Sequence, residues 1–239
     1  MATHSESLTA ATATELPGGV WRVDGSASNT FLVRDGDDED ASVYLVDAGV
    51  PGDAGAIRAT VSNAGYDLRD VDGVLLTHYD YDHVGALGRL TELDCPVYAH
   101  EPDASFLDGS ETPSLWPPKA LLQRVTGRFL DTPSLPVERV ADGDSVGSFT
   151  AYHTPGHGPG HLAWVSEERG IAFVGDLVRE DGGDLEASPW YISYSADEVR
   201  ESVRSLDDRA PDFETVCVGH GDPIASGGRE ALAALARSL

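Results

Sequence analysis

The chain has 239 residues, and 41% of them are apolar, which is enough for the core of one domain and too much for a disordered or fibrous protein. Acidic residues outnumber basic ones by 41 to 16, and the formal net charge of −25 predicts a surface that repels nucleic acid and anionic membranes. Every apolar run is far shorter than the roughly 20 residues that span a bilayer. We therefore expect a small-molecule substrate, with neither a nucleic-acid nor a membrane partner, and the sequence leaves the oligomeric state open.

The basic residues are 15 arginines and a single lysine, Lys119. Strong acidity with so little lysine is typical of proteins that work in molar salt, so we expect an acidic, halophilic protein. Residues 1–15 lack the basic and apolar regions of a signal peptide and predict a disordered lead-in to a cytoplasmic protein. Cys95 and Cys217 lie far apart beside apolar runs, which predicts two buried thiols.

The first part of the chain alternates short apolar runs with Asp- and Gly-rich turns. These runs predict strands at 20–23, 30–33, 42–47, 74–77 and 96–99, the first three of them an antiparallel meander. The charged run 36–40 is typical of a solvated hairpin turn. Apolar positions at helical spacing predict helices over 53–64 and 83–93.

The pattern weakens between residues 101 and 136, where prolines and aromatic residues gather around one helical stretch at 119–128. We interpret this segment as an insertion or lid within a single domain that covers residues 16–239. The second half predicts strands at 137–140, 148–153, 162–165, 171–174 and 215–218, and helices at 195–206 and 228–237. Two similar halves of this kind favour two sheets packed inside, with helices outside.

Three of the most apolar strands end on a side chain that can bind a metal ion, namely His78, Asp176 and His220. Open α/β sheets place their sites at such strand ends, and a rigid strand holds a ligand better than a free loop can. The first strand continues into four potential ligands within six residues, which are His78, Asp80, Asp82 and His83. A tight turn rich in glycine and proline presents His157 between two strands of the second half.

A mixture of histidine and aspartate suits zinc, iron or manganese, whereas calcium would take oxygen ligands alone. The alternative is an Asp-rich turn in which Asp82 only complements the start of a helix. That alternative explains one carboxylate and leaves the two flanking histidines and the three further ligands unexplained. We therefore expect the set to form one metal site.

The motif from Thr77 to His83, the His157 turn, Gly175-Asp176 and Gly219-His220 strongly resemble, in order and spacing, the metallo-β-lactamase superfamily. The resemblance covers nearly the whole chain and implies an α/β (α+β) fold, a four-layer αββα sandwich with a dinuclear metal site at one edge of the sheets. It places His78 and His157 in the first metal site and Asp176 as the bridging carboxylate. It implies the remaining ligands for the second site, which are Asp82, His83 and His220.

Asp80 departs from the common form of this motif, which has histidine at that position. Flavodiiron proteins of the same superfamily resemble this chain in placing a carboxylate there. An anionic oxygen ligand favours iron or manganese somewhat more than an imidazole does. We expect Asp80 to be a ligand of the first site because it alternates with His78 and Asp82 along an extended turn.

We expect a metal-dependent hydrolase with two divalent ions, zinc before iron or manganese, in which a metal-bound hydroxide attacks a small or medium ester, lactone or thioester. Asp82 is placed to orient the water or accept its proton, which makes it the catalytic residue. Around this site we expect His153 as a hydrogen-bonding neighbour and three aromatic side chains in the pocket, Trp116, Trp190 and Tyr191. Two alternatives stay open: an iron-dependent redox enzyme that handles dioxygen, and a metal-depleted binding module.

Overall fold

The computed structural model describes residues 14–38, 40–131 and 134–239. Most of the expected lead-in, residues 1–13, lies outside this part of the chain. The first strand, β1, begins at Thr14, two residues before the expected start of the domain, and pairs antiparallel with β2. No helix in the described part of the chain is both long and apolar enough to cross a membrane.

The first sheet has seven strands in the order in which they follow one another along the chain. Its strands are β1 (Thr14–Leu16), β2 (Val20–Arg22), β3 (Phe31–Asp35), β4 (Ser42–Val46), β5 (Gly73–Leu75), β6 (Val97–Ala99) and β7 (Val137–Arg139). The first four are antiparallel, as the predicted meander requires, and β4 to β7 are parallel. The parallel ends deliver their following loops to one edge of the sheet.

The second sheet has five strands in the order β14-β11-β10-β9-β8. These are β8 (Ser145–Val146), β9 (Phe149–His153), β10 (Leu162–Ser166), β11 (Ile171–Gly175) and β14 (Thr215–Val218). All neighbours are antiparallel except β11 and β14, which are parallel and therefore end at the same edge. A separate hairpin that the sequence analysis did not predict joins β12 (Val178–Asp181) to β13 (Asp184–Ala187).

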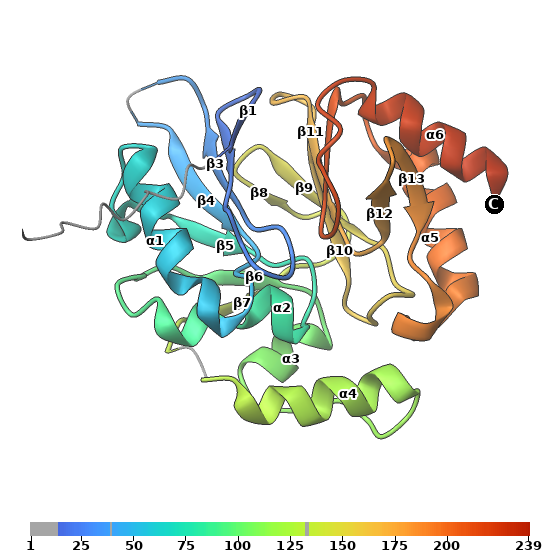
Figure 1. Cartoon of the computed structure of the whole chain (residues 1–239), viewed down its shortest axis with the longest axis horizontal. Coiled ribbons are helices and arrows are strands. Elements are labelled where there is room, and N and C mark those ends of the chain that lie inside the picture. Colours follow the sequence, from blue (N-terminus) through green and yellow to red (C-terminus); the bar gives the residue numbers. More distant parts are fainter. Residues whose placement is uncertain (1–13, 39, 132–133) are drawn as a thin grey trace, which may run out of the picture.

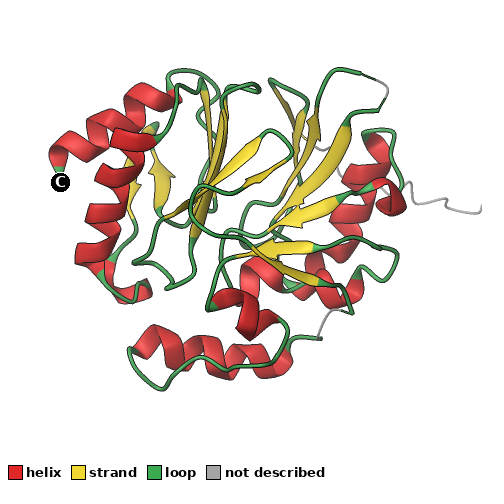
Figure 2. Ribbon diagram, turned by 180° about the vertical axis from the view of Figure 1, so that it is seen from behind, coloured by secondary structure: helices red, strands yellow, loops and turns green. Residues whose placement is uncertain are grey.

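Helices flank the two sheets on both sides, as Figures 1 and 2 show. The α-helices are α1 (Ala54–Asn63), α2 (Tyr81–Val84), α3 (Asp103–Leu107), α4 (Pro118–Thr126), α5 (Ala196–Arg209) and α6 (Gly228–Ser238). The short 3-10 helices are η1 (Pro51–Asp53), η2 (Leu68–Asp70), η3 (Leu87–Arg89), η4 (Gly127–Phe129) and η5 (Trp190–Ile192). In Figure 1, α1 covers the first sheet, α5 and α6 cover the second, and α4 lies across one end.

Alternating side chains of the strands explain the four layers. In β3, Phe31 and Val33 point into the core between the sheets, while Leu32 points into the core under α1. In β10, Trp164 joins the core between the sheets and Val165 joins the core under α5 and α6. Because both faces of these strands are buried, the strands read as nearly continuous apolar runs. The four-layer αββα sandwich is therefore confirmed.

One predicted helix was wrong in length. The expected helix over 83–93 is two short pieces, α2 and η3. The backbone N–H groups of Gly85 and Ala86 donate to the carbonyl oxygens of Gly49 and Ala48, at 2.8 and 3.0 Å, and so leave the helical pattern. The loop after β4 thus ends the helix directly behind His83 and holds that residue against the first sheet.

Candidate metal centre

The predicted ligands come from five segments that meet at one edge of the two sheets. His78 follows β5, Asp82 and His83 lie in α2, and Asp80 is the residue that precedes α2. The loop between β9 and β10 carries His157. Asp176 follows β11 and His220 follows β14, and these two strands are parallel. The topology alone therefore brings the ends of distant segments together.

Seven side chains offer donor atoms in three overlapping groups, within each of which the atoms lie less than 4.8 Å apart. We call His78, Asp80 and His157 the first group, and Asp82, His83 and His220 the second group. In the first group, Nε2 of His78 and Nε2 of His157 each lie 3.2 Å from Oδ2 of Asp80. In the second group, Nε2 of His220 lies 3.5 Å from Oδ2 of Asp82.

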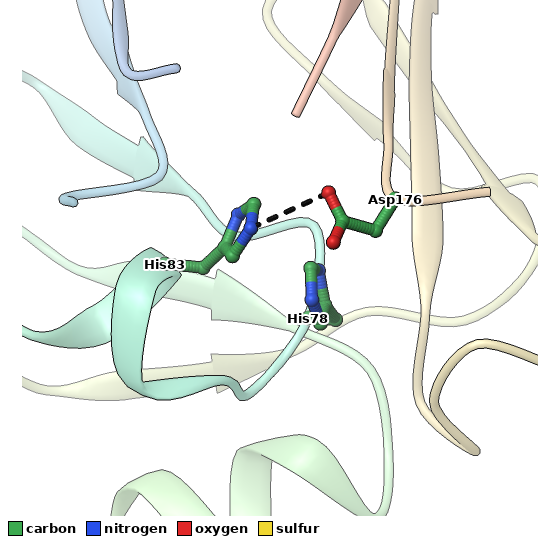
Figure 3. Close-up of side chains that lie close together, drawn as sticks. All are labelled: His78, His83 and Asp176. Carbon is green, nitrogen blue, oxygen red and sulfur yellow. Dashed lines mark ion pairs between the residues drawn. The ribbon is translucent and has the colours of Figure 1, made fainter. Parts of the chain in front are cut away.

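Asp176 lies between the two groups. Its Oδ1 is 3.4 Å from Nε2 of His83, and its Oδ2 is 3.4 Å from Nε2 of His157 and 3.2 Å from Nε2 of His220. Figure 3 shows the His83 ring and the Asp176 carboxylate pointing toward each other, with His78 beside them. A carboxylate in this position contacts donors of both groups, which is the geometry that a bridging ligand needs.

Two buried atoms of this cluster make no hydrogen bond within the described part of the chain. They are Nε2 of His83 and Oδ1 of Asp176. A buried polar atom without a partner is costly, and most such atoms in native proteins are satisfied. Since both atoms are good ligands for a divalent cation, the donor set fits a metal ion at this point.

Neighbouring side chains orient the ligands. Oδ2 of Asp47, at the end of β4, accepts hydrogen bonds from Nδ1 of His83 at 2.8 Å and from the Thr77 hydroxyl at 2.7 Å. The Nδ1–H of His83 is therefore occupied, and its Nε2 lone pair faces the cluster. Asp47 has a positive φ of 59°, a strained conformation that is common at functional sites.

The ring of His161 has the same kind of role for Asp176. Its Nε2 accepts a hydrogen bond from the backbone N–H of Asp176 at 3.1 Å, and its Nδ1 lies 2.9 Å from the hydroxyl of Thr154. Burial and the nearby His78 and His157 rings hold the pKa of His161 well below its usual value. The neutral ring therefore positions Asp176 without adding charge.

The electrostatics of the cluster favour ionised carboxylates. Burial alone would raise the pKa of Asp176, but its electrostatic interactions with the His83 and His157 rings and a hydrogen bond from His220 hold it well below its usual value. Burial would lower the pKa of His83, but the Asp176 and Asp47 carboxylates raise it well above its usual value. A hydrogen bond to Asp176 also raises the pKa of His220. A bound cation would replace protons on these rings.

Lys119 and Gln123 of α4 reach into the first group. Nζ of Lys119 lies 2.9 Å from Oδ2 of Asp80 and contacts Nε2 of His157, and Nε2 of Gln123 donates to Oδ1 of Asp80 at 2.8 Å. Burial would raise the pKa of Asp80, but the Lys119 charge and the contacts with the His157 and His78 rings hold it well below its usual value. Burial and the Lys119 charge lower the pKa of His157 to about 3.

The comparisons with known proteins agree with this geometry. A model of the metallo-beta-lactamase superfamily matches residues 23–220. The chain belongs to the metallo-β-lactamase superfamily. It is 28% identical to the probable metallo-hydrolase YybB of Bacillus subtilis strain 168, over 82% of this chain and 81% of that protein. The superfamily binds two metal ions in a site of this kind, and the protein is a metal-dependent hydrolase of this fold.

Solved structures of the superfamily have the same architecture. A metallo-β-lactamase family protein from Thermus thermophilus has a TM-score of 0.68 at 23% identity, and the match covers 92% of this chain and 79% of that one. The protein TTHA1623, solved in a di-iron-bound form, has a TM-score of 0.62 at 30% identity, over 85% of this chain and 92% of that one. The first of these two likenesses supports the fold alone.

The remaining predicted site residues are His153 and three aromatic residues, and one of the four lines the cavity next to the cluster. Tyr191 lines a cavity of about 460 Å³ that opens onto Asp80, Asp82, Asp176 and His220. Trp116 and Trp190 are 78% and 76% exposed, and neither lines this cavity. His153 does not contact a ligand side chain; its Nε2 donates to the carbonyl oxygen of Pro159 at 2.9 Å, in the turn that carries His157.

Sequence reasoning missed Asp47, Asp103, Lys119 and Gln123. Asp47 follows an apolar strand just as His78, Asp176 and His220 do, so the same pattern would have found it. Lys119 was notable as the single lysine of the chain, but the composition does not show where α4 packs. Asp103 accepts hydrogen bonds from the backbone N–H groups of Tyr79 at 2.7 Å and Gly160 at 3.2 Å, and no motif announces it.

Proposed function

We propose that the protein hydrolyses a small or medium ester, lactone or thioester at a centre formed by the seven donor residues, with zinc as the preferred ion. The observation that carries this proposal is the pair of unpartnered buried atoms, Nε2 of His83 and Oδ1 of Asp176, in the middle of the cluster. They mark a position that a cation would occupy, at the bottom of a cavity large enough for a substrate.

A divalent ion, when bound, supplies Lewis acidity, which polarises a carbonyl oxygen and lowers the pKa of water. The chain contributes the remaining functions. The Asp82 side chain is 29% exposed and lines the cavity, so its carboxylate can accept a proton from the attacking water. Asp176 and its partner His161 keep the cluster rigid, and His220 orients Asp82 through their 3.5 Å contact.

The walls of the cavity support an uncharged, partly apolar substrate. Pro118, Leu122, Tyr191 and Ile192 line it beside the carboxylates. Its one cationic residue among the described lining residues, Lys119, is already paired with Asp80. The net charge of −25 also disfavours strongly anionic substrates. These features fit an ester or lactone with an apolar group.

A relative with a named hydrolase activity supports the same reaction class. A hydroxyacylglutathione hydrolase of Bdellovibrio bacteriovorus is 28% identical over 147 residues, which cover 59% of this chain and 46% of that protein. Attack of water on an acyl carbon is common to esters, lactones and thioesters. Among the thioesters that the proposal includes, we expect those whose leaving group is not strongly anionic.

One observation favours a second candidate, an iron-dependent redox function. Asp80 supplies a carboxylate to the first group, and TTHA1623 has been solved with two irons. Oxygen ligands favour iron or manganese more than imidazole does. For this candidate, protein isolated under anaerobic conditions should contain iron and change its visible absorption on exposure to dioxygen.

The test of the hydrolase proposal uses protein stripped with a chelator and then reloaded with zinc, manganese or ferrous iron in concentrated KCl. We expect the stripped protein to be inactive toward a panel of aryl esters, lactones and acyl thioesters, and zinc to restore hydrolysis of at least one class. An Arg200→Gln variant is the matched control, because its exposed pair with Asp197 lies outside the cluster. Equal hydrolysis by stripped and reloaded protein would contradict the proposal.

A further inference from the structure

The single lysine of the chain is buried inside the metal cluster. Lys119 is 6% exposed, although lysine side chains almost never lie below the surface unless they are paired. All other basic residues are arginines, most of which pair with acidic groups nearer the surface. A compact ammonium fits between the two ligand atoms that it contacts, Oδ2 of Asp80 and Nε2 of His157, whereas the guanidinium of arginine is wider and planar.

Lys119 uses the same lone pairs that would bind a metal ion in the first group. Its Nζ lies 2.9 Å from Oδ2 of Asp80 and contacts Nε2 of His157. Because an ammonium can only donate, Nε2 of His157 accepts from Lys119 and holds the lone pair of the neutral ring, which leaves Nδ1–H to donate to the Ser188 hydroxyl at 2.8 Å. The ammonium therefore sits where the cation of the first group would sit.

The neighbouring residues hold this arrangement in place. Oδ1 of Asp80 accepts the amide of Gln123, whose own carbonyl oxygen accepts the hydroxyl of Tyr194. The same amide nitrogen donates to the carbonyl oxygen of Tyr79 at 2.6 Å. Lys119 and Gln123 lie one helical turn apart on the buried side of α4, so both approach Asp80 together.

The unpartnered atoms of the cluster lie on the other side. Nε2 of His83 and Oδ1 of Asp176 are the cluster atoms without a hydrogen bond among the described residues, and His83 belongs to the second group. The first group, in contrast, has its donors engaged by Lys119 and Gln123. The cluster thus has one half whose donor atoms are engaged and one half with two unpartnered buried ligand atoms.

The charges lead to the same conclusion. The three carboxylates of the donor set and the buried Asp47 beside His83 carry four negative charges, and one divalent ion with the Lys119 ammonium offsets three of them. A second divalent ion beside Lys119 would leave a buried excess of positive charge, which is strongly unfavourable away from water.

We propose that the Lys119 ammonium serves as the permanent cation of the first group, so that the protein retains one divalent ion per chain, bound by the second group and Asp176. This inference rests on the proposed metal centre and changes its expected occupancy from two ions to one. It makes α4 a structural part of the centre.

Metal content tests the inference directly. After loading with excess zinc and dialysis in concentrated KCl, we expect elemental analysis to give one zinc per wild-type chain and two per Lys119→Met chain. Arg124→Met is the matched control, because Arg124 lies on the same helix but bonds to Thr112 and Pro113, and it should retain one zinc. Two zinc ions in the wild type, or one in Lys119→Met, would overturn the inference while leaving the metal centre intact. No zinc in the wild type would contradict the proposed function as well.

A second measurement needs no variant. Because the chain has one lysine, acetylation by acetic anhydride followed by peptide mass analysis reports on Lys119 alone, apart from the N-terminal amine. We expect Lys119 in the zinc-loaded protein to react at least 10-fold more slowly than in the urea-unfolded chain. Reaction of Lys119 at the unfolded rate once zinc is bound would show that the ion expels the ammonium, and would overturn the inference.

Discussion

Asp176 contacts donors of both groups because it follows β11 next to the end of the parallel strand β14, where a glycine leaves space for its carboxylate. Gly219 follows the parallel strand β14, and a β-carbon at this position would lie 1.9 Å from Oδ1 of Asp176. Gly175, with a φ of +48°, turns the chain out of β11 just before the carboxylate. Steric limits therefore explain why a glycine precedes Asp176 at the end of β11 and His220 after β14.

We expect Asp176→Asn to lower kcat/KM more than about 100-fold, since loss of outer partners of metal ligands already costs 10- to 100-fold. The amide keeps the shape of the side chain but loses the charge that contacts His83, His157 and His220. Elemental analysis and initial rates on the same sample provide the measurement, and circular dichroism checks the fold. Normal rates in a metal-loaded Asp176→Asn protein would refute its role.

Asp80 and Lys119 form a buried pair whose halves depend on each other. We expect Asp80→Asn to lower the free energy of unfolding of the metal-free protein by about 3 kcal/mol, because the ammonium loses its counter-charge. Adding Lys119→Met should recover at least half of that loss, and urea unfolding of the four proteins in one salt concentration measures the coupling. Additive effects of the two substitutions would show that the pair is not coupled.

At the scale of single residues, the sequence predicted which potential ligands converge better than it predicted the side chains that contact them. His78, Asp82 and His83 form a local motif, His157 lies in a turn rich in glycine and proline, and Asp176 and His220 follow strand ends, so local patterns along the chain identify them. Asp80 and Lys119, in contrast, meet across 39 positions only because α4 packs on the site. Side-chain pairing between distant segments has no local signal.

Elements are positioned by backbone contacts as well as by apolar faces. Asp103 begins α3 and accepts hydrogen bonds from Tyr79, next to His78, and from Gly160, in the turn that carries His157. It thereby joins two ligand-bearing loops. The segment expected as an insertion or lid contributes α3 and α4 to the site. The side chains of these helices reach the site through tertiary packing, so the weak pattern of this segment did not predict their role.

The ionisation of Asp103 predicts that the free energy of unfolding depends on pH. Burial raises its pKa to about 6, so between about pH 4 and 6 the folded chain binds a proton that the unfolded chain releases. This contribution to stability is complete below pH 4 and is lost as the pH rises through 6, by up to about 3 kcal/mol.

The comparison with Asp103→Asn isolates this effect from the other titrating groups. We expect the stability of the wild type relative to Asp103→Asn, measured by urea unfolding of metal-free protein at constant salt, to fall between pH 4 and 6. A difference that stays constant across this range would mean that Asp103 does not titrate there.

The four-layer architecture of the molecule depends on strands that are buried on both faces. The short apolar run at 30–33 predicted a strand, and the order of strands and helices predicted two sheets inside helices. The sequence analysis did not predict the separate hairpin of β12 and β13. Arg179 and Glu186 pair across this hairpin, and such a pair exists only after the two strands have come together.

The net charge of −25 predicts that the free energy of unfolding depends on salt. Like charges repel in the compact state, and the distance over which they act shrinks from about 10 Å at 0.1 M salt to about 3 Å at 1 M. We therefore expect KCl to raise the free energy of unfolding by about 1 to 3 kcal/mol over this range, with most of the gain below about 0.5 M.

A charge-neutralised variant separates repulsion from other effects of salt. Glu168, Glu201 and Asp208 are exposed on the side of the second sheet and its helices. We expect Glu168→Gln, Glu201→Gln and Asp208→Asn, combined, to stabilise the protein at 0.1 M KCl and to make no difference at 1 M. Unfolding curves of both proteins across the salt series provide the measurement. If the variant keeps the full salt dependence of the wild type at every concentration, salt acts through exclusion from the protein surface, and self-repulsion of the acidic surface is not what the salt relieves.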